Sequence, residues 1–112
     1  MHKQFEIWTA DLNPKFGTEP GKTRPVLILQ NDILNQIHPS CLICPITTVT
    51  RNNVSILRVN ILKKSSGLKK DSAVMIDQIR AIDNKRLLKK IGDLPIDLHD
   101  TVKENIKIIM NL

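Results

Sequence analysis

Aromatic side chains are scarce in this sequence of 112 residues, which contains Phe5, Trp8 and Phe16 but no tyrosine. Several RNA-binding folds stack bases on exposed aromatic rings of an open sheet. With only three rings spread through the chain, such a stacking platform is not expected. Any nucleic acid would be held mainly by charge and hydrogen bonds.

Long apolar runs are also lacking. No run approaches the roughly 18 apolar residues of a membrane-spanning helix, and the first residues lack the apolar core of a signal peptide. Hydrophobic residues nevertheless form 41 % of the sequence and are spread over many short runs. We therefore expect residues 1–112 to fold as one domain, and we expect a soluble, cytoplasmic protein with no membrane partner.

Cysteine and histidine are too few and too scattered to predict a metal site. Cys41 and Cys44 have the C-x-x-C spacing of some zinc and redox sites, which is one interpretation, but the sequence has no second cysteine pair. Their neighbours form an apolar run typical of a strand, and residues three apart on a strand point to opposite faces. We interpret both as buried structural thiols. No metal and no cofactor is predicted.

Positive charge is in excess, with 17 Lys and Arg against 11 Asp and Glu and a net charge of +6. A basic surface suits a polyanionic partner, most commonly nucleic acid, although it also serves solubility alone. Lysine pairs stand at 63–64 and 69–70. We interpret them as solvated faces that add long-range attraction for a polyanion and make no specific contacts.

Short apolar segments separated by turn residues predict a mainly β fold with short helices. The predicted strands cover residues 5–12, 25–30, 41–46, 54–62, 72–76 and 89–94, and a segment that alternates polar and apolar residues covers 77–83. Helical turns are predicted at 31–37, capped by Asn31 or Asp32, and at 84–88. This pattern favours a small, strongly curved antiparallel sheet or a partly open barrel.

The C-terminal segment has a different periodicity. Apolar residues recur at helical spacing at Leu98, Val102, Ile106, Ile109 and Met110, which predicts an amphipathic helix packed on the sheet. Asp97 is the predicted N-cap. We expect Leu98, Val102 and Ile106 to face the core.

The segment 13–30 contains the candidate site. Its first half is punctuated by glycine and proline, which predicts a loop of defined shape. Its second half begins at Arg24-Pro25 and continues as the apolar run 26–29, which predicts a buried strand. Arg24 therefore stands between an exposed loop and the core, where a guanidinium is well placed to bind an anion. An ordinary surface arginine is the alternative.

Three polar segments end or interrupt predicted strands: the loop leading to Arg24, residues 45–48 and residues 75–80. Together they can supply a guanidinium, hydroxyls, a carboxylate and an amide to one groove. Such groups suit a phosphodiester, because a cation stabilises developing charge and donors hold the nonbridging oxygens. RNA supplies its own nucleophile in the 2′-OH, so its cleavage requires mainly orientation and proton transfer.

The sequence closely resembles the MazF/PemK family of toxin endoribonucleases from type II toxin–antitoxin systems. The matching pieces follow the family's order and spacing: DLNP (11–14), GTE (17–19), GKTRPV (21–26), QND (30–32), PIT (45–47), DS (71–72) and DQIRAIDNKRL (77–87). The resemblance implies an SH3-like partly open barrel of the CcdB/PemK type, a homodimer and a cognate antitoxin. It also implies metal-independent, sequence-specific cleavage of single-stranded RNA, mainly mRNA, leaving 2′,3′-cyclic phosphate and 5′-hydroxyl ends.

The family's two catalytic positions fall on Arg24 and Thr47. The resemblance implies that Arg24 takes part in proton transfer and stabilises the phosphate, and that Thr47 hydrogen-bonds the scissile phosphate. Because a guanidinium stays protonated near neutrality, charge stabilisation is the more direct part of the first role. Thr48 would replace Thr47 if the latter pointed inward, because neighbours on a strand face opposite ways.

Other RNA-binding positions are carried over from the family to Phe16, Thr18, Glu19, Asp77 and Gln78, together with Thr48. For Phe16 the alternative is a loop residue tucked over the core, and for Gln78 it is a solvated strand residue. Asp77 and Asp83 would alternatively be turn residues that pair with nearby lysines.

Two other functions fit the same architecture. CcdB toxins resemble this fold and inhibit DNA gyrase by binding without catalysis. A nucleic-acid-binding module that never cuts its ligand is the other alternative. Because both Arg24 and Thr47 match the ribonuclease pattern, the endoribonuclease is the leading hypothesis.

Overall fold

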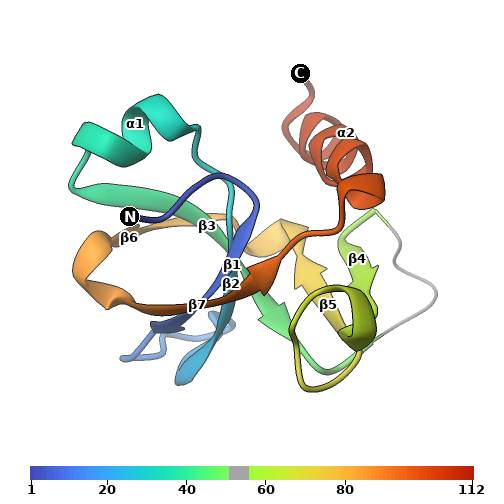
Figure 1. Ribbon diagram of the computed structural model, residues 1–112, viewed down its shortest axis with the longest axis horizontal. Coiled ribbons are helices and arrows are strands. Elements are labelled where there is room, and N and C mark those ends of the chain that lie inside the picture. The colour runs from blue at the N-terminus through green and yellow to red at the C-terminus, as the bar shows by residue number, and fades with distance from the viewer. Residues whose placement is uncertain (51–55) are drawn as a thin grey trace.

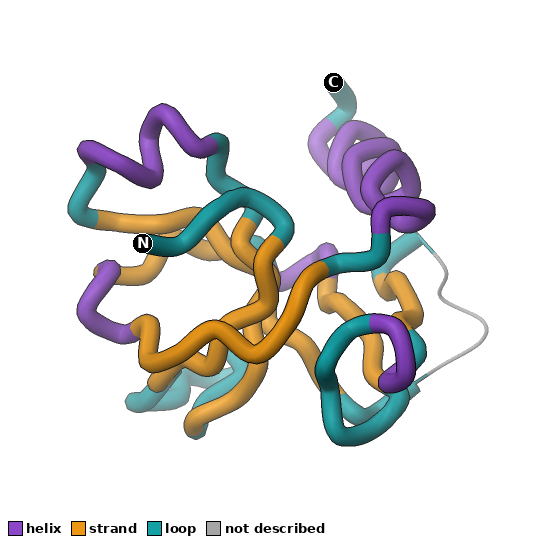
Figure 2. Tube along the Cα trace, in the orientation of Figure 1, coloured by secondary structure: helices purple, strands orange, loops and turns teal. Residues whose placement is uncertain are grey.

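The computed structural model describes residues 1–50 and 56–112, and in these residues seven strands form one antiparallel sheet (Figure 1). The strands are β1 (Glu6–Asp11), β2 (Thr23–Ile28), β3 (Ser40–Thr47), β4 (Arg58–Ile61), β5 (Ser72–Met75), β6 (Arg80–Asp83) and β7 (Leu87–Asp93). The α-helices are α1 (Asp32–Ile37) and α2 (His99–Met110), and the 3₁₀ turns are η1 (Lys63–Ser65), η2 (Ile76–Gln78), η3 (Asn84–Arg86) and η4 (Ile96–Leu98). The strands cross the middle of the molecule, and the helices α1 and α2 lie at its periphery (Figure 2). The predicted mainly β fold with a C-terminal helix is confirmed.

Strand β3 is the centre of the sheet. The strand order is β4-β5-β3-β2-β1-β7, and β6 also pairs with β3. Ile46 faces Val74 of β5, whereas Ile43 faces Arg80 of β6. Three residues of β3 thus correspond to six of its partner, because η2 inserts one turn between β5 and β6. The single alternating segment predicted over 77–83 is therefore wrong at its start, where Asp77 and Gln78 lie in this turn.

The predicted strand 54–62 is only partly observed. β4 covers Arg58–Ile61, and Ile56 and Leu57 form a turn before it. Residues 51–55, which include the predicted start of this strand, lie outside the described residues.

The sheet is apolar on both faces. Along β2, Leu27 packs in one buried cluster with Phe5, Ile7 and Ile46, whereas its neighbours Val26 and Ile28 pack in a second cluster. Successive residues of a strand point to opposite faces. The continuous apolar run 26–29 is therefore what a strand covered on both sides requires.

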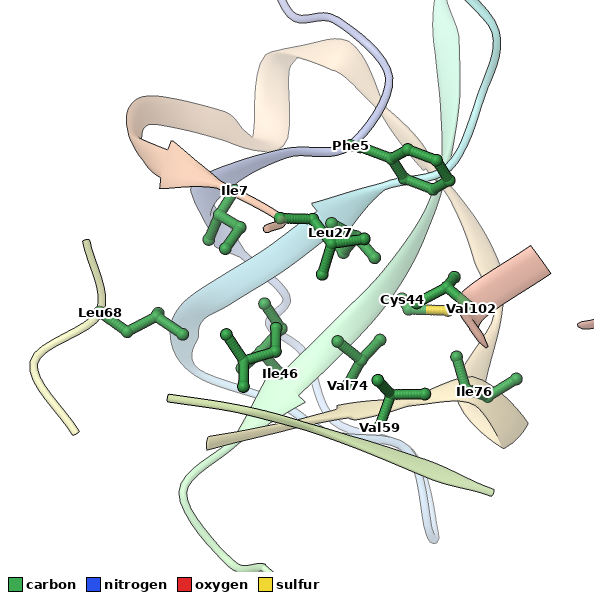
Figure 3. Packing of buried hydrophobic residues seen from close by; sticks show 12 residues of the cluster. Phe5, Ile7, Leu27, Cys44, Ile46, Val59, Leu68, Val74, Ile76 and Val102 are labelled. Carbon is green, nitrogen blue, oxygen red and sulfur yellow. The ribbon is translucent and has the colours of Figure 1, made fainter. Parts of the chain in front are cut away.

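Helix α2 covers the first of these clusters. Val102 is fully buried and reaches in beside Cys44 and Ile76 (Figure 3). Leu98 and Ile106 are partly buried and pack against the same cluster, as predicted.

Asp97 is not the N-cap of this helix. The turn η4 precedes α2, so Asp97 lies inside that turn and Leu98 takes the N-cap position without a side-chain hydrogen bond. The 3₁₀ turn moves the N-cap by one residue, from the predicted Asp97 to Leu98. The prediction for α1 is confirmed, because the Asn31 side chain accepts a hydrogen bond from the Leu34 N–H.

A close backbone crossing joins the loop after η1 to strand β7. Gly67 has φ +82°, and a Cβ atom added there would overlap the Ile91 carbonyl oxygen. A Cβ atom added at Gly92 would likewise overlap the carbonyl oxygen of Ser66. Glycine at 67 and 92 therefore allows the loop to lie directly against β7, at an edge of the described sheet (Figure 1).

Candidate active site

The loop between β1 and β2 is closed by hydrogen bonds at its base and near its tip. The Leu12 N–H donates to the Lys22 carbonyl at 2.9 Å, and the Lys22 N–H donates to Asn13 Oδ1 at 2.9 Å. Near the tip, the Glu19 N–H donates to the Phe16 carbonyl at 2.9 Å. These bonds give the loop the defined shape that its glycines and prolines predict.

Arg24 is the second residue of β2 and is half-buried. Its Nε donates to the carbonyl oxygen of Gly21 at 3.0 Å, which fixes the plane of the guanidinium. No hydrogen bond to the described residues engages its Nη groups. The two outer nitrogens are therefore available to a ligand.

Thr47 ends β3 next to Arg24. Val26 faces Pro45 at the end of the β2–β3 ladder, and Arg24 and Thr47 each lie two residues beyond this pair. Thr47 Oγ1 accepts a hydrogen bond from the Val49 N–H at 3.2 Å. Because an accepting hydroxyl keeps its own hydrogen, Thr47 can still donate to a ligand.

Arg24 and Thr47 line one open pocket of about 490 Å³, here called the Arg24–Thr47 pocket. Its lining residues are Lys15, Thr18, Glu19, Pro20, Arg24, Thr47, Val49, Arg58 and Met75. Four predicted site residues meet here: Arg24, Thr47, Thr18 and Glu19. The pocket holds three cationic side chains and one carboxylate, so its charge suits an anionic ligand.

Sequence reasoning missed Lys15 and Arg58 as pocket residues. Arg58 Nη1 forms an ion pair with Asp77 Oδ1, and the two side chains are 20 % and 32 % exposed. Strand β4 thus meets η2 at the wall of the pocket. The available signal was that Arg58 is the only charged residue in the otherwise largely apolar segment 54–62.

The chain matches a known protein family over almost its whole length. A family model described as the PemK-like, MazF-like toxin of type II toxin–antitoxin systems matches residues 3–110. The chain belongs to this toxin family. Among curated relatives, Endoribonuclease EndoA of Bacillus subtilis (strain 168) is 37 % identical over 110 residues, covering 98 % of this chain and 95 % of the relative.

Solved structures show the same PemK/MazF fold. The Mycobacterium tuberculosis toxin MazF-mt6 is 27 % identical and superposes with a TM-score of 0.81, covering 96 % of this chain and 97 % of that one. A mycobacterial endoribonuclease in complex with its cognate antitoxin has a TM-score of 0.81 at 18 % identity, covering 100 % and 97 %, which shows likeness of fold alone. The predicted family and its fold are confirmed.

Two other predicted RNA-binding residues of this toxin are connected to the pocket without lining it: Phe16 lies in the same loop as Thr18 and Glu19, and Asp77 pairs with Arg58. Phe16 is 70 % exposed, so the alternative that it is tucked over the core is wrong. Asp77 pairs with an arginine and not with a lysine. Asp83 is the last residue of β6, and its side chain caps the following turn η3 by accepting a hydrogen bond from the Lys85 backbone N–H at 2.8 Å.

Thr48 and Gln78 are not brought to the Arg24–Thr47 pocket. Gln78 is half-buried in η2 and lines neither of the two large pockets formed by the described residues. Thr48 lines the second pocket, of about 480 Å³, here called the lysine pocket. Its lining residues are Thr9, Thr23, Arg24, Pro25, Thr48, Gly67, Leu68, Lys69, Lys70, Ser72, Lys89 and Ile91.

The two cysteines of this toxin are buried structural thiols, as predicted. Cys41 lies in one apolar cluster and Cys44 in the other, and they form no disulfide. Burial raises the pKa of Cys41 to about 11, and burial together with the charge of Asp77 raises the pKa of Cys44 to about 12. Both remain neutral near pH 7, so neither is a ready thiolate for metal or redox chemistry.

Two further observations concern the described residues only. Within residues 1–50 and 56–112, no three His, Cys, Asp or Glu side chains gather into a group that could hold a metal ion. In the same residues, neither α-helix is long and apolar enough to cross a membrane.

Proposed function

We propose that this toxin is an endoribonuclease that cleaves single-stranded RNA in the Arg24–Thr47 pocket without a metal ion. The observation that carries the proposal is the convergence of Arg24 and Thr47 on one pocket from neighbouring strands. The relative EndoA, an endoribonuclease by name, is 37 % identical over nearly the whole chain and supports the same activity.

The chemistry follows from what RNA and the pocket each supply. The 2′-oxygen attacks the adjacent phosphorus, the bond from phosphorus to the 5′-oxygen breaks, and a 2′,3′-cyclic phosphate and a 5′-hydroxyl result. The 2′-OH loses a proton and the leaving oxygen gains one. Negative charge grows on the nonbridging oxygens in the transition state, so donors aimed there accelerate the step.

Arg24 is assigned to the phosphate. Its Nε is engaged by the Gly21 carbonyl, which leaves the Nη groups to hydrogen-bond a nonbridging oxygen and the oxygens that exchange protons. Thr47 donates its hydroxyl hydrogen to the same phosphate, while the Val49 N–H holds the hydroxyl oxygen in place. Both groups are oriented before substrate arrives, so little free energy is lost in ordering them.

The remaining predicted residues are assigned to substrate recognition. Thr18 and Glu19 line the pocket and can hydrogen-bond bases. Phe16 is exposed at the loop tip, where its ring can stack on one base. Asp77 acts through its ion pair with Arg58. Thr48 and Gln78 are assigned to RNA on either side of the pocket.

The proposed partners follow from the same family. A solved structure shows a mycobacterial endoribonuclease of the same fold in complex with its cognate antitoxin. We assign to this chain an antitoxin whose acidic and apolar tail lies across the basic groove and folds on binding. A homodimer and a cytoplasmic location are part of the proposal.

The test compares wild type with Arg24→Ala and Thr47→Val on a long, weakly structured RNA in excess EDTA. Thr47→Val keeps the shape of the side chain and removes the hydroxyl. Thr101→Val on exposed α2 is the matched control. Fragments should carry cyclic-phosphate ends, and both site variants should cleave at least ~100-fold more slowly, as for loss of one transition-state donor.

Each contrary result identifies a different error. Intact RNA after incubation with folded, antitoxin-free protein would refute ribonuclease activity, and gyrase inhibition or plain binding would then be tested. Cleavage that stops in EDTA and returns with Mg²⁺ would refute metal independence. Equal rates for wild type and Thr47→Val would remove Thr47 from the mechanism.

A further inference from the structure

The lysine pocket carries a cluster of positive charge without a compensating carboxylate. Lys69, Lys70, Lys89 and Arg24 line it, and its lining residues include no Asp or Glu. The nearby carboxylate of Asp71 is engaged elsewhere, because it accepts the Lys63 N–H at 2.9 Å. Four cations around one cavity repel one another, so the site is expected to favour an anion.

The neighbouring lysine on β7 shows the contrast. Lys90 pairs with Glu6 at 3.0 Å and with Asp93 at 3.3 Å. Lys89, one residue earlier and facing Thr9 on β1, forms no ion pair with the described residues. Strand β7 therefore has one neutralised lysine and one uncompensated lysine that lines the pocket.

The pocket is built from a fixed loop. The glycine crossing at 67 and 92 holds residues 66–68 against β7. Ser72 Oγ donates to the Lys70 carbonyl at 2.8 Å, and Ser66 Oγ donates to the Leu62 carbonyl at 3.0 Å. Lys69 and Lys70 are thus carried on a constrained segment, and both side chains are exposed, as predicted, while lining the pocket.

The lysine pocket and the Arg24–Thr47 pocket share one lining residue, Arg24. Arg24 lines both pockets, and the consecutive residues Thr47 and Thr48 line one each. A polymer that places a phosphate on Arg24 and Thr47 can therefore extend into the lysine pocket. Lysine ammonium groups bind phosphate as point charges, and Pro25, Leu68 and Ile91 provide apolar surface for a base or ribose.

We propose that the lysine pocket binds a nucleotide next to the cleaved bond, with Lys69, Lys70 and Lys89 holding its phosphate. This inference rests on the proposed function, since it treats the ligand as the RNA substrate. The three lysines are positioning residues that bind flanking RNA and do not touch the reacting atoms.

The experiment measures binding separately from cleavage. The probe is a fluorescent 2′-O-methyl RNA, which has no 2′-OH nucleophile and cannot be cleaved by this route. The test variant is Lys69→Gln/Lys70→Gln/Lys89→Gln. The control is Lys63→Gln/Lys64→Gln/Lys90→Gln, which removes the same number of charges from the preceding turn η1 and from the same strand. None of these three lysines lines either large pocket.

The test variant should bind the probe about tenfold more weakly at physiological salt, and the slope of log K against log salt should fall by about 1 to 2. The control should differ from wild type by less than threefold. Equal weakening of RNA binding in both variants would show that binding depends only on total charge, and it would overturn the proposal. Unchanged binding in both variants would also overturn it. RNA binding that stays at the wild-type level while affinity for an oligoglutamate peptide falls would identify a protein-docking site and also overturn it.

Failure of the ribonuclease proposal gives a different pattern. Wild type would then bind the probe through the three lysines and yet leave unmodified RNA intact. With an active enzyme, the test variant should cleave a mapped site more slowly in a long RNA at subsaturating concentration and recover at saturation. Loss of the saturating rate itself would overturn the assignment of these lysines to positioning.

Discussion

Val102 is the point at which packing between α2 and the sheet can be tested most directly. Its side chain is 0 % exposed and lies in the cluster with Phe5, Cys44 and Ile76. Val102→Ala removes two methyl groups, worth about 1.6 kcal/mol of transfer free energy, and the unfilled cavity brings the loss of stability to about 2–3 kcal/mol. Val102→Asp adds the burial of a carboxyl group without a partner, which costs several kcal/mol more.

The total loss of unfolding free energy expected for Val102→Asp is comparable to the roughly 5–15 kcal/mol that stabilises a typical domain. We expect this variant to be largely unfolded at 25 °C and Val102→Ala to unfold at lower urea with an unchanged slope. Thr101→Asp is the control, because Thr101 is exposed in the first turn, where a negative charge is tolerated. Circular dichroism in urea measures all three. A urea midpoint for Val102→Asp within error of the wild-type value would refute our account of how α2 packs.

Three other predictions concern local structure. Gly92→Ala should lower the free energy of unfolding by at least ~2 kcal/mol, because its Cβ would overlap the Ser66 carbonyl oxygen; an unchanged melting temperature would contradict that crossing. Asn31→Ala should cost about 1 kcal/mol in urea denaturation through loss of the cap of α1, and a neutral effect would show the cap to be unimportant. Folding raises the thiol pKa to about 11 for Cys41 and to about 12 for Cys44. The resulting contribution to the free energy of unfolding is complete below the unfolded thiol pKa of about 9, and it is lost as pH rises towards 11. Between pH 8 and 10.5 wild type should therefore lose up to about 2 kcal/mol per thiol more than a Cys41→Ala/Cys44→Ala variant, and parallel losses would contradict the shifts.

The sequence predicted best where the determining interactions are local. The apolar run after Arg24, the cap at Asn31 and the helical spacing around Val102 each depend on residues within one or two turns, and each appears in the structure. The separation of Cys41 from Cys44 into two clusters follows from strand alternation alone.

The failures came from interactions between distant segments. Nothing local to Arg58 indicates that it pairs with Asp77, 19 residues further along the chain. The turn η2 that shifts the pairing from β5 to β6 is decided by how β3 is shared between two partners. The failure at Asp97 is instead local, because a competing 3₁₀ turn forms directly before the helix.

The predicted site residues also divide into those whose positions follow from local sequence and those whose positions depend on distant segments. Four residues chosen from the family motifs line one pocket: Arg24, Thr47, Thr18 and Glu19. They come together because the β1–β2 loop and the β2–β3 ladder fix their relative positions. It could not distinguish the environments of Thr47 and Thr48, which depend on a second pocket assembled from β7 and the loop after η1. The chemical roles of all these residues remain predictions until the variants are measured.

Strand β7 has a consequence for how an inhibitor can dock. It ends the strand order of the described sheet, and its register against β1 shifts between Ile7 and Trp8 and again between Thr9 and Ala10. Irregular pairing and adjacent lysines are the features by which natural sheets discourage an additional strand at an open edge. This edge is therefore a poor template for aggregation or for an inhibitor that adds as a strand. A segment that silences this toxin is therefore not expected to add as a strand at β7, and its pockets offer a docking surface where it would compete directly with the substrate.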